Sequence, residues 1–155
     1  WLQQEPFGVV VDYAHTPDSL KVVYETLHSP LATRHSKLIC VLGAAGGGRD
    51  KWKRKQFGVL AAQYCDRIIL TNEDPYDEMP EKIIDDIISG ISVESRKSKV
   101  ETILDRADAI AAALTDTQQG DIVVITGKGS ETSIALAHGK KIPWSDAQIV
   151  REFLS

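Results

Sequence analysis

Long hydrophobic runs, aromatic residues and sulfur-containing residues are all scarce in this sequence of 155 residues. No apolar run approaches the roughly 20 residues that span a bilayer, so no membrane segment is predicted. The net charge of −4 argues against a general nucleic-acid-binding protein, although residues 49–55 are locally basic. We therefore expect a globular protein whose partner is a small molecule.

Cysteine occurs only at Cys40 and Cys65, each inside an apolar segment. These cysteines lack the paired spacing of zinc sites and the histidines show no H-x-x-H pattern, so no metal site is predicted. The expectation is two buried free thiols in a reducing compartment instead of a disulfide. Because the chain starts at Trp1 and shows no signal peptide, we expect a segment of a longer cytoplasmic protein.

Short β-branched runs alternate with segments of helical periodicity along the whole chain. The predicted strands lie at 7–12, 38–42, 66–71, 100–104 and 122–126. Residues 139–143 predict a further short, antiparallel edge strand. This alternation predicts one α/β domain with a Rossmann-like, doubly wound, mostly parallel sheet and flanking helices. Ligands of such sheets bind at the carboxyl ends of the strands.

A cluster of glycines at 43–48 joins one predicted strand to a basic helix. The segment is not a Walker A motif, because Arg49 and Asp50 stand where Lys and Ser or Thr are needed, and no dinucleotide fingerprint fits. Two interpretations stay open: a flexible turn before a solvated basic helix face, or an anion site. Arg49 is the strongest candidate ligand because a guanidinium holds a carboxylate or phosphate through two parallel hydrogen bonds.

Polar residues lie at the carboxyl ends of three other predicted strands. The Asp12 carboxylate is suited to accept hydrogen bonds from a ribose, and the His15 imidazole is suited to approach a phosphate or a metal-bound water. The alternative is a turn into a helix in which these polar residues act as caps. The acidic segment 73–78 is either a solvated turn or a receptor for an ammonium group. Residues 127–131 offer backbone donors, one cation and one carboxylate, which together suit an amino acid zwitterion.

Five motifs, in this order, resemble the C-terminal domain of the Mur ligases: DYAHTPDSL, LGAAGGGRDKWKR, TNEDPYDEMP, GDIVVITGKGSE and IPWSDAQIVREFL. The resemblance covers essentially the whole chain and is greatest to the tripeptide synthetases, which add the third residue of the peptidoglycan stem peptide. It implies a bacterial, cytoplasmic, ATP-dependent ligase of cell-wall biogenesis. ATP phosphorylates the terminal carboxylate of UDP-N-acetylmuramoyl-L-Ala-D-Glu, and the amine of a free diamino acid attacks the acyl phosphate.

The resemblance further implies that this chain is only the amino-acid-binding and lid domain of such a ligase. The central ATPase domain, which it would contact, and the UDP-sugar domain would be absent. ATP and magnesium would be held mainly by the central domain. The isolated domain would hold no catalytic residue of its own and would be inactive.

The resemblance also assigns two groups of site residues. Those facing the nucleotide would be Asp12, which would hold the ribose, Tyr13, His15 and Asp18. Those binding the incoming amino acid would be Arg49 at its carboxylate, Gly127 and Glu131 at its distal end, and Glu73, Asp74 and Tyr76 at its side chain.

The loop at 73–76 departs from the members that add diaminopimelate, which read Asp-Asn-Pro-Arg there. Tyr76 cannot replace the arginine's charge, so charge matching to an acidic loop favours a diamino acid without a distal carboxylate, such as lysine. Ser130 also stands where many members carry histidine. The third amino acid therefore stays open between lysine and diaminopimelate.

Three other functions are compatible with the same motifs. Two are enzymes of the same type: a ligase that recycles murein peptides, and a folylpolyglutamate-like enzyme. The third is a non-catalytic module that binds an amino acid or a nucleotide.

Overall fold

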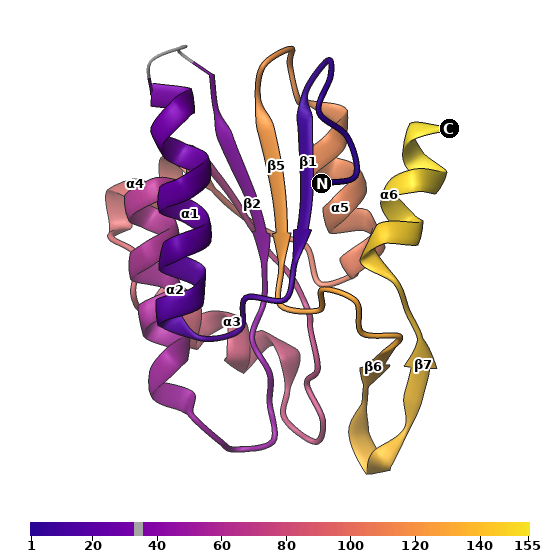
Figure 1. Cartoon of the computed structure of the whole chain (residues 1–155). Helices are drawn as coiled ribbons and strands as arrows, with labels where there is room; N and C mark the ends of the chain where they lie inside the picture. The colour runs from indigo at the N-terminus through magenta and orange to yellow at the C-terminus, as the bar shows by residue number, and fades with distance from the viewer. Residues whose placement is uncertain (33–35) are drawn as a thin grey trace.

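Five parallel strands form the centre of the molecule (Figure 1). The structure is a computed structural model. It describes residues 1–32 and 36–155, except for the side chains of residues 30–32 and 98. The strands are β1 (Gly8–Asp12), β2 (Leu38–Leu42), β3 (Arg67–Leu70), β4 (Val100–Thr102) and β5 (Ile122–Thr126). Their order across the sheet is β1-β5-β2-β3-β4. The predicted doubly wound α/β architecture is confirmed.

The register of the strands brings their carboxyl ends to one edge of the sheet. Asp12 of β1 lies opposite Thr126 of β5, and Leu42 of β2 lies opposite Leu70 of β3. Because the sheet is parallel, the loops that follow these strands emerge side by side. Every residue of β2 and β5 is buried, which explains why these strands read as continuous apolar runs and not as alternating ones.

Helices cover both faces of the sheet (Figure 1). The larger apolar cluster joins one face to α1 (Pro17–Ala32), α2 (Lys51–Tyr64) and α3 (Pro80–Ile88). The second cluster joins the other face to α5 (Arg106–Thr115) and α6 (Asp146–Leu154). None of the helices in the described part of the chain is long and apolar enough to cross a membrane.

The starts of three helices follow local capping and proline preferences. Pro17 is the first residue of α1, and the Asp105 side chain caps α5 by accepting a hydrogen bond from the Asp108 amide at 2.9 Å. The Ser145 hydroxyl caps α6 through the Gln148 amide at 3.2 Å. The Gln148 side chain does not complete a capping box with Ser145 but donates to Glu152 at 2.8 Å.

The polar run at 94–99 lies in the short helix α4 (Val93–Lys99). One element differs from the sequence-based prediction. The predicted edge strand does not join the main sheet. It forms β7 (Lys141–Pro143), which pairs with β6 (Ser133–Ala135) around a short 3-10 helix, η1 (Ala137–Gly139), in a separate antiparallel sheet.

The outer edge of β1 is already occupied near the N-terminus of the chain. There, Gln3 and Val9 form an antiparallel bridge. This contact leaves less of that edge open to a further strand.

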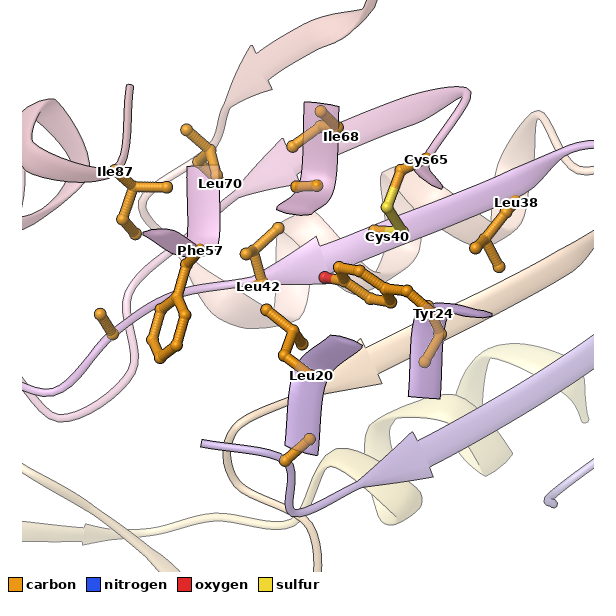
Figure 2. Close-up of a cluster of buried hydrophobic side chains, with 14 of the residues drawn as sticks. Leu20, Tyr24, Leu38, Cys40, Leu42, Phe57, Cys65, Ile68, Leu70 and Ile87 are labelled. Carbon is orange, nitrogen blue, oxygen red and sulfur yellow. A yellow bond between two sulfur atoms is a disulfide. The ribbon is translucent and has the colours of Figure 1, made fainter. Parts of the chain in front are cut away.

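Cys40 and Cys65 form a disulfide inside the larger apolar cluster (Figure 2). The expectation of two free thiols is therefore wrong. Cys40 lies in β2, and Cys65 follows the last residue of α2, two residues before the start of β3, the strand that pairs with β2. This pairing brings the two Cα atoms to 6.1 Å across a sequence separation of 25 residues, which linear spacing does not reveal.

Helix α2 packs closely against α3 and the turn that follows it, because glycine stands at two of the points of contact. A Cβ at Gly58 would overlap the Ile87 carbonyl oxygen, and one at Gly90 would overlap the Lys55 carbonyl oxygen. The two backbones therefore approach more closely than any larger residue would permit.

We expect Gly58→Ala to destabilise the protein, although the same change in an open helix stabilises by about 1 kcal/mol. The added methyl group must push α3 away, which should lower the free energy of unfolding by about 2 kcal/mol. Urea unfolding of both proteins measures the change. Gln56→Ala, at an exposed position of α2, is the control and should change little. A stabilised Gly58→Ala variant would contradict the close packing.

Candidate functional site

A cleft of about 590 Å³ opens at the carboxyl edge of the sheet. Its walls come from the loops that follow β1, β2, β3 and β5, which the parallel register places together. The predicted site residues that line it are Tyr13, His15, Arg49, Glu73, Asp74, Tyr76, Gly127 and Glu131. The structure thus gathers segments that are more than 100 residues apart in the sequence.

The predicted nucleotide residues divide into two groups. Tyr13 and His15 are exposed and line the cleft, with ring centroids 4.5 Å apart. Asp12 and Asp18 are not among the lining residues. The Asp12 carboxylate accepts a hydrogen bond from the Ala14 amide at 2.8 Å, so it caps the turn after β1, and a ribose contact stays a prediction.

The glycine loop is bound to the neighbouring acidic loop. The Gly46 amide donates to the Asp74 carbonyl oxygen at 2.7 Å, and the Gly48 amide donates to the Glu78 carboxylate at 2.6 Å. Asp50, the residue before α2, has a left-handed backbone and makes no side-chain cap. Because two of its N–H groups already have partners, the loop is not an open cradle for phosphate.

Arg54 corrects the expectation that the basic part of α2 is a solvated face. Its side chain is 2% exposed, and its guanidinium donates to Glu78 at 3.0 Å and to Asp86 at 2.9 Å. It also donates to the Ala45 carbonyl oxygen at 3.0 Å, which ties the glycine loop to the acidic loop a second time. Sequence periodicity missed Arg54, since its partners lie after β3 in the chain.

Arg49, by contrast, is exposed, lines the cleft, and makes no hydrogen bond or ion pair with the residues that the structure describes. The loop around Arg49 is held on both sides. Before it, the Gly48 amide donates to Glu78, and after it, the Arg54 side chain donates to the Ala45 carbonyl oxygen. A free guanidinium on an anchored loop is suited to hold a carboxylate through two hydrogen bonds.

Asp74 is not part of a solvated acidic loop. Its two carboxylate oxygens lie 2.9 and 2.8 Å from the Lys128 ammonium, and one accepts from the Ala135 amide at 2.7 Å. Lys128, with its side chain 1% exposed, also contacts Glu131 at 2.6 Å. The charge-matching argument for lysine therefore loses its basis, because Asp74 is neutralised within the protein.

Glu73 is buried at the base of the cleft, against Gly127. A Cβ at Gly127 would overlap the Glu73 carboxyl group, so glycine is required there. Burial raises the pKa of Glu73 to about 7; Asp74 and Glu131 act in the same direction, and Arg106 and Lys128 oppose it. Glu73 therefore changes its charge near neutral pH.

Arg106, at the start of α5, holds the base of the cleft together and was not predicted. Its buried guanidinium contacts both carboxylate oxygens of Asp146 at 2.8 Å. It also donates to the carbonyl oxygens of Asn72 at 3.2 Å and Thr126 at 3.0 Å, which lie where β3 and β5 end. Arg106 and Asp146 each directly follow a capping residue, so the sequence marks both as surface positions at helix starts.

The sequence pattern of a family described as "Mur ligase, glutamate ligase domain" matches residues 1–129. The chain belongs to this family. Two similar proteins are each named UDP-N-acetylmuramoyl-L-alanyl-D-glutamate--2,6-diaminopimelate ligase. The one from Aquifex aeolicus is 46% identical over 153 residues, covering 99% of this chain and 30% of that protein. The one from Nitrosomonas europaea is 43% identical, covering 94% and 29%. This Mur ligase domain therefore spans about three tenths of the length of these relatives.

Solved structures support the same relationship. One of a ligase with the same diaminopimelate name matches with a TM-score of 0.82 and 37% identity, over 94% of this chain and 28% of that one. A domain from a putative ligase of Haemophilus ducreyi matches with a TM-score of 0.59 at 10% identity, which shows the shared fold alone.

We expect Glu73→Gln to stabilise the Mur ligase domain at alkaline pH. The raised pKa means that the folded state holds the Glu73 proton more tightly than the unfolded state does. The resulting stabilisation is complete below pH 4.5, the ordinary pKa of glutamate, and is lost as the pH rises through about 7. Glutamine mimics the protonated side chain. The variant should therefore match the wild type near pH 4.5 and exceed its free energy of unfolding by about 2 kcal/mol at pH 8. Urea unfolding at both pH values tests this, and equal stabilities at pH 8 would contradict it.

Glu78→Gln should act in the opposite direction. The hydrogen bond from Arg54 lowers the pKa of Glu78 to about 2, with the Gly48 amide adding to the effect. Ionised Glu78 thus stabilises the fold above pH 4.5, and that stabilisation is lost as the pH falls through about 2. We expect the variant to lose about 2 kcal/mol at pH 7, with the deficit shrinking in acid. The control is Glu81→Gln, at an exposed position of α3, which should show no such loss.

Proposed function

We propose that this domain is the C-terminal part of a cytoplasmic, ATP-dependent ligase that adds 2,6-diaminopimelate to UDP-N-acetylmuramoyl-L-alanyl-D-glutamate in peptidoglycan biosynthesis. The observation that carries the proposal is the cleft, in which the free guanidinium of Arg49 shares the walls with the carboxyl groups of Glu73 and Glu131. Opposite charges in one cleft suit a molecule that carries both a carboxylate and an ammonium group. The names of the relatives supply the identity of that molecule.

Within this proposal, Arg49 holds the carboxylate of the incoming amino acid, and Glu131 receives an ammonium group. Glu73 lies beneath them, and Tyr76 contributes an exposed aromatic ring to the wall. Binding in this position orients the amine for attack on the acyl phosphate of the muramoyl dipeptide, which forms the amide bond and releases phosphate. The domain contributes binding and orientation rather than a group that reacts.

We assign ATP and magnesium mainly to a separate domain of the full-length protein. The glycine loop fits phosphate poorly because the Gly46 and Gly48 amides have partners. Among the described residues, no group of three or more His, Cys, Asp or Glu side chains is placed to hold a metal ion. This domain would contact the nucleotide only at its edge, through residues at the mouth of the cleft and beside it: Asp12, Tyr13, His15 and Asp18.

The first test is phosphate release by the full-length protein with ATP, UDP-N-acetylmuramoyl-L-Ala-D-Glu and meso-diaminopimelate. Release should require both substrates. The 155-residue chain alone should release none, and sustained turnover by it would contradict the assignment of ATP to another domain.

Arg49→Lys in the full-length protein should raise the KM for the amino acid about tenfold or more and leave kcat nearly unchanged, because lysine cannot form the paired hydrogen bonds. Lys55→Ala is the control, since Lys55 is exposed on α2 outside the cleft. Unchanged kinetics in Arg49→Lys would remove Arg49 from the amino acid site.

A further inference from the structure

A second hollow, of about 440 Å³, continues from the cleft toward the β6–β7 hairpin. We call it the hairpin groove. It shares Tyr13, Asp74, Tyr76 and Glu131 with the cleft, so the two form one connected surface. Its own walls add Lys128, Lys141 and three residues that carry hydroxyl groups, Ser130, Thr132 and Ser133. A ligand long enough to leave the cleft past Glu131 would enter this groove.

The hairpin is fixed to the acidic loop by its backbone. The Ala135 amide donates to the Asp74 carboxylate at 2.7 Å, and the Ala135 carbonyl oxygen accepts from the Tyr76 amide at 3.2 Å. Lys141 is the residue paired with Ala135 across the hairpin. These contacts fix the backbone of Lys141 through its partner Ala135, and its exposed side chain lines the same hollow as Tyr76.

Lys141 is the available cation of the hairpin groove. Lys128 is buried and occupied by Asp74 and Glu131. Lys141 lines the groove and makes no side-chain hydrogen bond or ion pair with any described residue. Glu131, whose side chain is 41% exposed, keeps a face open to both hollows. Among the residues that the structure describes, the groove therefore offers Lys141 as a free cation and Glu131 as an accessible carboxylate, and the cleft offers Arg49 and Glu131.

We propose that the hairpin groove binds the far end of the diamino acid, with Lys141 holding its distal carboxylate and the groove hydroxyls donating further hydrogen bonds. The inference rests on the proposed function. Diaminopimelate carries an amino acid group at both ends, and the surface places a free cation in each of its two connected hollows. Lysine has no distal carboxylate, so Lys141 would be a specificity-determining residue.

The test compares Lys141→Met with Lys140→Met in the full-length protein. Lys140 is its exposed neighbour and does not line the groove, so the control removes the same charge beside it. The KM for meso-diaminopimelate should rise about tenfold in Lys141→Met, as expected for the loss of a charge-assisted hydrogen bond. Lys140→Met should match the wild type. Activity with L-lysine should be the same in all three proteins.

The result separates the two proposals. If the wild type turns over diaminopimelate and Lys141→Met keeps the wild-type KM, or if its KM for lysine rises equally, the distal-carboxylate role of Lys141 is overturned and the proposed function stands. If the wild type releases no phosphate with diaminopimelate, or uses lysine alone, the proposed function is overturned, and the subsite with it.

Discussion

The cleft depends on a single buried guanidinium. Arg106 joins the ends of β3 and β5 through the carbonyl oxygens of Asn72 and Thr126, and its charge is balanced by Asp146 at the start of α6. Without Asp146 the buried charge of Arg106 would be strongly destabilising. The ends of β3 and β5 and the starts of α5 and α6 are therefore joined through one ion pair. Glu73 and Gly127 follow directly on the two tethered strand ends. Glu73 and Gly127 meet at the base of the cleft, next to the carbonyl oxygens that Arg106 binds.

Most charged side chains around the cleft are paired with other groups of the protein, and few remain free to bind a ligand. Arg54 and Glu78 lock the glycine loop onto the acidic loop, and Lys128 neutralises Asp74 across the neighbouring loop. These pairs tie down the loop backbones that carry the free groups, which reduces the ordering that binding would require. Of the described residues that line the two hollows, the cations without a partner are Arg49 in the cleft and Lys141 in the hairpin groove. Their separation into two connected hollows is the feature that suits a ligand with two charged ends.

Residue type alone could not distinguish charged side chains that are free from those that are paired within the protein. Asp74 and Glu131 both read as acids of exposed loops, yet Asp74 is bound on both oxygens, whereas Glu131 keeps an open face. Arg49 and Arg54 lie five residues apart in the same basic run, but only Arg54 turns toward partners that come from after β3. The disulfide was misjudged for the same reason, because the pairing of β2 with β3 brings its two cysteines together.

The sequence by itself determined the alternation of strands and helices, the helix starts at Pro17, Asp105 and Ser145, and the loops that carry the site. These features depend on local periodicity, capping and turn chemistry, which act over a few residues. Only the tertiary structure decided which charges are paired, that Cys40 meets Cys65, and that the β6–β7 hairpin stands apart beside Tyr76. Each of these outcomes joins residues far apart in the chain, and their meeting is set by strand order, which no local pattern encodes.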